Sequence, residues 1–247
     1  MSHIERVSAH LERLRTDELA LVRNYFKSGM SVLEIGGGSG WQAKQISKLN
    51  CEVHSIDLPN RLNLSKFFNV VDYDGRIIPF APESFDIVFS SNVLEHVSDI
   101  NNILSELRRV LKKNGLAVLV MPTPSWRFWT IVSHFPYLLG ASIKHLMFRN
   151  IPSSGDCNKI TIIPPPHGEY KSSFHEIYYY SRCRWGRAFR ANSLNMIDCY
   201  PTGVFCTGYA LFPNIGIGVR KKLARVFGSA GNVYIVTKND RVFGARS

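Results

Sequence analysis

A cluster of glycines and an aspartate that follows it are the residues whose types and spacing most clearly indicate chemistry. Four glycines stand between a short apolar run and a stretch with helical periodicity: Gly36, Gly37, Gly38 and Gly40. A glycine-rich turn between a strand and a helix lets the backbone approach a ligand closely and directs helix N–H groups toward it. Asp57 ends the next apolar run, roughly 20 residues after the first glycine, a spacing at which a carboxylate can accept hydrogen bonds from a ribose. The pair predicts a site for a nucleotide-type ligand.

Two common phosphate-binding patterns are absent from this turn. A P-loop ends in Gly-Lys-Ser/Thr, whereas Gly40 is followed by Trp41 and Gln42. The dinucleotide fingerprint, counted from Gly36, requires a glycine where Trp41 stands. The pattern that remains is Glu34-x-Gly36-x-Gly38-x-Gly40. A tight turn with an unrelated surface aspartate stays open as the alternative.

The surrounding sequence alternates between strand-like and helix-like segments. The predicted strands are residues 31–36, 52–57, 68–71, 85–90, 116–121, 196–205 and 233–237. Helices are predicted at 41–49 and 100–111, the latter with Asp99 as N-cap, and two separate helices are expected before the first strand, at 4–14 and 19–26. Strands that alternate with helices imply right-handed crossovers and a mainly parallel sheet.

The ordered motifs resemble those of class I S-adenosylmethionine (SAM)-dependent methyltransferases of the type 11 kind. The resemblance covers residues 30–122 and is carried by five segments in order: 32–40, 55–57, 72–80, 84–97 and 107–120. It implies an α/β fold: a Rossmann-like open sheet of about seven mostly parallel strands, with helices on both faces and an antiparallel last strand. One residue departs from the pattern, because Glu34 stands where the family more often has aspartate.

The resemblance also implies SAM as cofactor and assigns its contacts. The glycines would line the methionine moiety, with Glu34 beneath it near the ammonium group. Asp57 would hold the ribose, and Asp74 the adenine amino group, with Asp72 as the reserve choice. The predicted cofactor-binding residues are Glu34, Gly36, Gly38, Gly40, Asp57, Leu58, Tyr73, Asp74, Ser91 and Asn92.

His96 is the predicted general base. Methyl transfer from a sulfonium is an in-line displacement in which the protein aligns the acceptor and often removes its proton. His96 follows the fourth strand, at the carboxyl edge of the sheet where ligands bind in open α/β folds. The alternative is that Glu95 and His96 only cap and pack the next helix. His167 and His175 are further candidates, and no residue is predicted to bind a metal.

The second half of the chain is expected to choose the acceptor. The predicted organisation is a SAM-binding half with N-terminal helices (1–122), a substrate-recognition insertion (123–194) and C-terminal strands that complete the sheet (195–247). Residues 126–150 are rich in aromatic side chains but are interrupted by Pro136 and fall short of a membrane span. They are interpreted as a lid over the site, with peripheral contact to a membrane left open. Residues 151–170 are expected to be loop-like.

Charge and cysteine content leave several partners open. The net charge is +11, and arginines and lysines cluster at 182–190 and 220–225, which favours acidic partners such as nucleic acid, anionic membrane or a phosphorylated substrate. The five cysteines form no Cys-x-x-Cys pair, and the N-terminus lacks an apolar signal core, so a cytoplasmic location is expected, with the inner membrane face left open.

Three functions are compatible with these motifs and with the charge of the chain. The first is methylation of a small-molecule or glycan acceptor. An oxygen atom of the acceptor is the favoured target, and a nitrogen or carbon atom is less favoured. Residues 122–129 resemble methyltransferases of bacterial surface-glycan and lipid-linked saccharide pathways. The second is an RNA or protein methyltransferase that docks through the basic clusters, although nucleic acid is not favoured. The third is a non-catalytic SAM-binding partner subunit.

Overall fold

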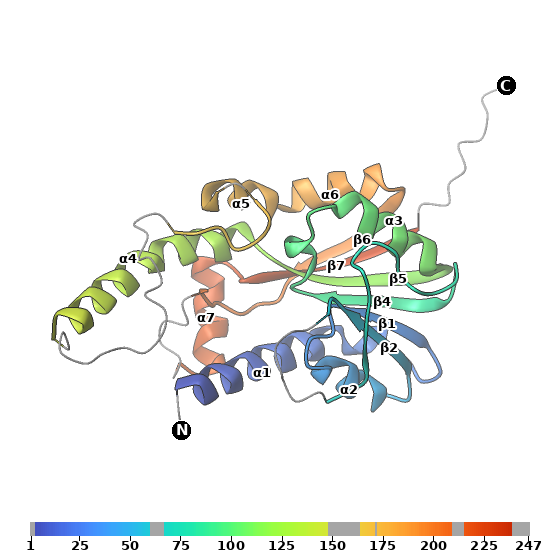
Figure 1. Cartoon of the computed structure of the whole chain (residues 1–247), viewed down its shortest axis with the longest axis horizontal. Helices are drawn as coiled ribbons and strands as arrows, with labels where there is room; N and C mark the ends of the chain where they lie inside the picture. The colour runs from blue at the N-terminus through green and yellow to red at the C-terminus, as the bar shows by residue number, and fades with distance from the viewer. Residues whose placement is uncertain (1–2, 60–66, 148–163, 171, 209–214, 239–247) are drawn as a thin grey trace.

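The computed structural model describes residues 3–59, 67–147, 164–170, 172–208 and 215–238. Its centre is a seven-stranded sheet in the order β3-β2-β1-β4-β5-β7-β6 (Figure 1). The strands are β1 (Ser31–Ile35), β2 (Glu52–Asp57), β3 (Val70–Asp72), β4 (Phe85–Ser91), β5 (Leu111–Pro122), β6 (Leu194–Pro201) and β7 (Gly231–Lys238). The first five pair in parallel, and β7 runs antiparallel between β5 and β6. The predicted fold class is confirmed.

Helices cover both faces of this sheet. They are α1 (His3–Val22), α2 (Trp41–Ser47), α3 (Ile100–Val110), α4 (Pro124–Met147), α5 (Ser173–Tyr179), α6 (Arg182–Ala191) and α7 (Ile217–Phe227), with 3-10 turns η1 (Arg23–Tyr25) and η2 (Leu94–His96). In Figure 1, α3 and α6 lie on one face of the sheet and α1 and α2 on the other. α4 projects beyond the sheet, and α5 packs against α4.

The alternation of side chains along the central strands explains the two-sided core. Leu33 and Val88 point into a cluster with α3 and α6, whereas Val32 and Ile87 point into a cluster with α1 and α2. Successive residues of a strand face opposite sides, so a sheet covered on both sides needs nearly continuous apolar strands. The sheet therefore forms a rigid support whose carboxyl edge can hold a site.

Two of the helices differ from the sequence-based expectation. The predicted pair of helices before the first strand is wrong, because α1 is one continuous helix followed by η1. No glycine or proline occurs between positions 3 and 22 to interrupt it. α4 likewise continues through Pro136, although an interruption was expected. Pro136 cannot donate to the carbonyl of Val132, and both residues are exposed, so water can satisfy that carbonyl.

None of the described helices is long and apolar enough to cross a bilayer. The predicted loop at 151–163 and the last residues of the predicted lid, 148–150, lie outside the described residues.

Candidate active site at the carboxyl edge of the sheet

The glycine turn joins β1 to α2 through backbone contacts. The N–H groups of Gly36 and Gly37 both donate to the carbonyl oxygen of Ile56, at 2.8 and 3.1 Å, which ties the turn to β2. Gly36 has a φ of +80°, and a Cβ atom there would overlap the side chain of Val93, just after β4. Glycine is therefore required at position 36 for its backbone angle and for close approach to the next strand.

Asp57 lies at the tip of β2, directly beside this turn. Its Oδ2 accepts from the Gly38 N–H at 2.7 Å, and its Oδ1 accepts from the Leu58 N–H at 2.7 Å. A carboxylate offers about four acceptor positions, so both oxygens can still accept from a ligand. The predicted ribose-binding acid is thus fixed in place by the loop that is predicted to hold the rest of the cofactor.

Glu34 lies beneath the glycine turn. Its side chain is buried and its Oε2 accepts from the Ser55 hydroxyl at 2.6 Å. A Cβ on Gly37 would overlap the Ser55 hydroxyl and lie 3.0 Å from Glu34 Oε2. Burial raises the pKa of Glu34 to about 7, and the hydrogen bond from Ser55 offsets this only in part. The role of Glu34 beneath the methionine part of the cofactor stays a prediction.

The predicted adenine-binding residues follow β3. Oδ1 of the exposed Asp74 accepts from the backbone N–H groups of Arg76 and Ile77 at 2.8 and 2.9 Å, and these bonds lower its pKa. Tyr73 is half-buried and donates its N–H to the carbonyl of Asp57 at 3.0 Å. The turn after β3 therefore lies against the tip of β2.

Asp72 and Leu58 lie next to the predicted adenine-binding residues. Asp72, the reserve choice for adenine, pairs in register with Asp57 across β2 and β3. Leu58 is exposed beside the turn, and a Cβ on Gly75 would contact its side chain.

Ser91 and Asn92, at the end of β4, contact α1. Arg15 donates to the Ser91 hydroxyl at 2.8 Å and pairs with Glu18 at 2.9 Å. The same Glu18 carboxylate accepts from Ser91 at 3.2 Å and from Asn92 at 3.4 Å. Sequence reasoning missed Arg15 and Glu18, because an arginine three residues before a glutamate in an amphipathic helix is also typical of a solvated ion pair.

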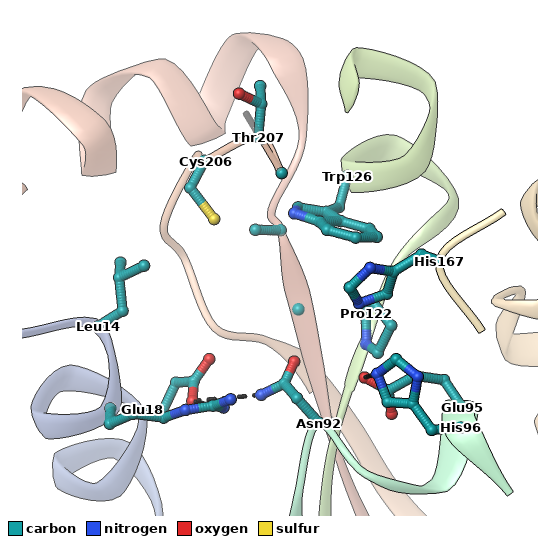
Figure 2. A pocket seen from close by; sticks show the side chains of 14 residues that line it. Leu14, Glu18, Asn92, Glu95, His96, Pro122, Trp126, His167, Cys206 and Thr207 are labelled. Carbon is teal, nitrogen blue, oxygen red and sulfur yellow. Dashed lines mark hydrogen bonds and ion pairs between the residues drawn. The ribbon is translucent and has the colours of Figure 1, made fainter. Parts of the chain in front are cut away.

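A cavity of about 380 Å³ opens beside these residues. Figure 2 shows that its wall is assembled from α1, the segment after β4, the start of α4, His167 and the chain before α7. Its lining includes Glu18, Asn92, Glu95, His96, Trp126, His167 and Cys206. Of the predicted cofactor residues, only Asn92 lines it. The glycine turn adjoins it through the contact of Gly36 with Val93. The cavity therefore lies to one side of most of the predicted cofactor-binding residues.

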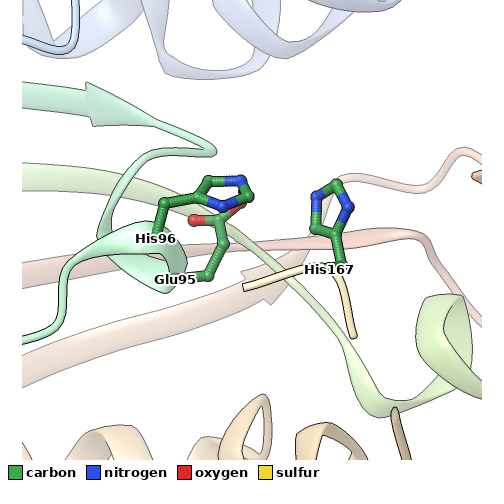
Figure 3. Close-up of side chains that lie close together, drawn as sticks. All are labelled: Glu95, His96 and His167. Atoms are coloured by element: carbon green, nitrogen blue, oxygen red, sulfur yellow. The ribbon is translucent and has the colours of Figure 1, made fainter. Parts of the chain in front are cut away.

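Glu95, His96 and His167 lie together at one end of this cavity (Figure 3). The His96 and His167 rings are 4.8 Å apart between centroids, and His96 Nε2 is 3.9 Å from Glu95 Oε1. Neither carboxylate oxygen of the buried Glu95 has a hydrogen-bond partner among the described residues, and burial raises its pKa to about 7.

Both histidines of this cluster favour the neutral form. Desolvation lowers the pKa of His96, and desolvation together with the neighbouring His96 lowers the pKa of His167 to about 4. Neutral imidazoles can accept a proton or a metal ion, so both side chains are available for chemistry at neutral pH.

Buried charges hold His167 in this position. Glu176 Oε1 accepts from the backbone N–H groups of His167 and Gly168 at 2.7 and 2.6 Å. The buried Arg127 pairs with Glu176 at 2.6 Å and donates to the carbonyl of Pro165 at 2.6 Å. Trp126 packs edge-on against the His167 ring at 4.8 Å. Residues from α4 and α5 therefore fix a histidine that lies far from His96 in the sequence.

The remaining sequence candidates lie away from the cavity. His175 is exposed, and its Nδ1 is 2.7 Å from the Ser172 hydroxyl at the start of α5. In the basic cluster of α6, Arg187 is exposed and donates to Tyr178, and Arg184 lies over the ring of Tyr179. In the other cluster, Arg220 is buried and donates to backbone carbonyls, so it supports the fold of that segment.

The aromatic stretch of α4 faces several directions. Trp126 lines the cavity, and Trp129 packs against Phe227 of α7 with its Nε1–H donating to the Phe227 carbonyl at 2.9 Å. Other large side chains are exposed: Phe128, Val132, Phe135, Tyr137 and Leu139. The start of the helix therefore borders the cavity, and peripheral membrane contact of its outer part stays a prediction.

Comparison with known proteins agrees with this geometry. A family described as "Methyltransferase domain" matches residues 33–119, from β1 to β5. The match supports the resemblance of this segment to class I SAM-dependent methyltransferases. The matched segment contains the glycine turn, Asp57, Ser91, Asn92 and His96, whereas His167, Arg127 and Glu176 lie beyond it.

Individual methyltransferases are similar over part of the chain. Phosphoethanolamine N-methyltransferase 2 of Caenorhabditis elegans is 27% identical over 50% of this chain and 32% of its own length. A ubiquinone biosynthesis O-methyltransferase of Bradyrhizobium diazoefficiens is 30% identical over 42% of this chain and 44% of its own length. The chain thus spans less than half the length of these curated relatives.

A solved structure extends the similarity in fold. A Burkholderia thailandensis 1,6-didemethyltoxoflavin-N1-methyltransferase, solved with S-adenosylhomocysteine bound, superposes with a TM-score of 0.54 at 13% identity, over 92% of this chain and 78% of its own. At that identity the similarity establishes the fold.

Proposed function

We propose that this methyltransferase moves the methyl group of SAM to a hydroxyl oxygen of a small-molecule acceptor bound in the cavity beside β4. The observation that carries the proposal is the location of Glu95, His96 and His167 in that cavity, next to the segment that contacts the glycine turn. The C. elegans and Bradyrhizobium relatives are named as N- and O-methyltransferases of small molecules.

The cofactor end is built from residues that fit SAM. Gly36, Gly38 and Gly40 have positive φ angles and no Cβ atom, so the methionine part could lie close to the backbone of this turn, and the space beside Gly38 is open. The two Asp57 oxygens, already oriented by backbone N–H groups, would accept from the ribose hydroxyls. Glu34 would compensate the ammonium group from below, and Asp74 and Tyr73 would border the adenine. When bound, SAM supplies a methyl group activated by a sulfonium.

The acceptor end supplies proton acceptors. An alcohol that is methylated must lose its proton, whereas a neutral amine can attack with its lone pair, so a group that takes up a proton is of most use for an oxygen acceptor. His96 or His167 would take the hydroxyl proton as the oxygen attacks the methyl carbon. The carbon–sulfur bond then breaks with both electrons going to sulfur, which yields S-adenosylhomocysteine.

Transfer of labelled methyl from SAM into fractionated small-molecule extracts tests this function. We expect label in an alkali-stable ether product, and saccharide and lipid-linked fractions provide separate arms for the acceptor class. His96→Ala should lower kcat at least about 100-fold, the usual contribution of a general base, with little change in SAM affinity. Label found only in RNA or protein, or full activity of His96→Ala, would contradict the proposal.

A further inference from the structure

The cluster at the end of the cavity has the composition of a metal site. Glu95, His96 and His167 each offer one ligand atom, and these atoms all lie within 4.8 Å of one another. Around a single ion with bonds of about 2.0–2.2 Å, ligand atoms stand roughly 3–3.5 Å apart. Small side-chain rotations would therefore bring the three atoms to one ion (Figure 3).

The Glu95 carboxylate is an independent sign that something is bound. It is 1% exposed, lines the cavity, and has no hydrogen-bond partner for either oxygen among the described residues. A buried polar group without a partner lowers stability, and more so if it is charged, so natural proteins rarely keep one without a reason. A cation between Glu95 and the two rings would provide the missing partner.

The third ligand is held in place before any ion arrives. Gly168 allows the loop to lie against the backbone of Glu95, because a Cβ there would overlap the Glu95 carbonyl. The Glu176 carboxylate and Trp126 fix the loop and the ring of His167 from two other directions. This many supports for a single loop histidine are typical of a site whose ligands are preorganised.

We propose that Glu95, His96 and His167 bind one divalent transition-metal ion at the acceptor end of the cavity. Two imidazoles and one carboxylate favour Zn²⁺, Fe²⁺ or Mn²⁺ over Mg²⁺, which prefers oxygen ligands and water. Three protein ligands leave coordination positions toward the open cavity, as in catalytic rather than structural sites. No local spacing indicates this site, because His167 is far from the Glu95-His96 pair in the chain.

The inference rests on the proposed function and gives the site a defined role in it. The ion would hold the acceptor oxygen and lower the pKa of its hydroxyl, so that the proton leaves to solvent before or during attack on the methyl carbon. The products are the methyl ether, S-adenosylhomocysteine and one proton. With the ion bound, His96 and His167 would hold the ion instead of taking the proton themselves, and the ion would replace them in activating the acceptor hydroxyl.

Calorimetric titration of the full chain, stripped with chelator and dialysed, tests the site directly. We expect Zn²⁺ to bind at one ion per chain and Mg²⁺ not to compete. Bound Co²⁺ should give the visible absorption of a site with nitrogen ligands. Glu95→Gln and His167→Ala should each weaken Zn²⁺ binding at least about 100-fold, more than the 10–100-fold that is common for loss of a supporting contact.

His175→Ala is the matched control, because His175 is exposed and its ring is near Ser172 rather than the cavity. Its Zn²⁺ affinity should equal that of the unchanged chain. Absence of saturable binding, or equal affinity of the His167→Ala, Glu95→Gln and His175→Ala variants, would overturn the proposal. S-adenosylhomocysteine binding measured in excess chelator reports separately on the cofactor end, so failure of the metal site and failure of the methyltransferase function are distinguishable.

Discussion

The cofactor end and the acceptor end of the site are constructed in different ways. The cofactor end uses backbone groups from adjacent strands: Gly36 and Gly37 donate to Ile56, and Gly38 donates to Asp57. The acceptor end uses side chains from separated parts of the chain, supported by the buried pair of Arg127 and Glu176.

This difference determines how each end can fail. A turn fixed by backbone angles and close approach is sensitive to any added Cβ atom but tolerates changes in surrounding side chains. A loop fixed by a buried ion pair is sensitive to the loss of one charge, because the other is left without compensation in a site of low dielectric constant. Substitutions in the two ends should therefore separate stability effects from ligand-binding effects.

Loss of the buried charge at the acceptor end should give the largest effect. Glu176→Gln keeps the shape of the side chain but leaves Arg127 buried without its counter-charge, so the free energy of unfolding should fall by about 3–5 kcal/mol. Urea denaturation measures this change. The double variant Arg127→Met/Glu176→Leu should recover part of the loss, and a single variant as stable as the unchanged chain would show that the pair does not support α4 and α5.

The addition of a methyl group to the glycine turn should have the second-largest effect. Gly36→Ala combines a positive φ with overlap of Val93, and we expect a loss of about 2–4 kcal/mol from backbone strain and overpacking. Gly38→Ala is the control, since its φ is also positive but no atom lies within 4 Å of the added Cβ, and it should lose only about 1 kcal/mol. Thermal unfolding compares the two, and equal losses would refute the contact with Val93.

Removal of the Asp57 carboxylate should affect the ligand more than the fold. Asp57→Ala removes two acceptors from the predicted ribose position, so the SAM affinity should fall about 10–100-fold, as expected for hydrogen bonds to a charged group. Calorimetry with S-adenosylhomocysteine measures the affinity, and circular dichroism checks the fold. Unchanged affinity would remove Asp57 from the cofactor site.

The pH dependence of stability should report on Glu34. Its pKa is raised from 4.5 to about 7 in the folded chain, so the folded state binds one more proton than the unfolded state between these values. The stability from this group is complete below pH 4.5 and is lost as the pH rises to about 7, at up to about 1.4 kcal/mol per pH unit. Glu95 also has a pKa raised to about 7 and adds a slope of the same sign, so Glu34→Gln should remove about half of the combined slope, measured by denaturation from pH 5 to 7. An unchanged slope would contradict the assignment.

The basic clusters should contribute least. Arg187 is exposed on α6, and Arg187→Ala should change stability by less than about 0.5 kcal/mol and leave methyl transfer to a small acceptor unaffected. A large rise in KM that depends on salt concentration would indicate docking of a nucleic acid or acidic protein instead.

The difference between a cofactor end built from backbone groups and an acceptor end built from distant side chains also explains what could be predicted from the sequence. Glycine spacing, the aspartate after the second strand and the order of strands all reflect local backbone geometry, so the fold and the placement of Gly36 and Asp57 followed from residues close together in the chain. The contacts of Arg15 with Ser91 and of Glu95 with His167 depend on how distant elements pack. No local spacing records that packing. Helix propensity favours a continuous α1, which contains no glycine or proline, whereas α4 continues through the exposed Pro136 against its propensity.

The position of β7 between β5 and β6 has a consequence for synthesis of the chain. β5 is complete at Pro122, but its partner on that side begins only at Gly231. At about 5–20 residues per second, the edge of β5 stays unpaired for several seconds after it leaves the ribosome. An apolar strand with an open edge is a site for aggregation during that time, so chaperone supply and translation rate should affect the yield of this protein.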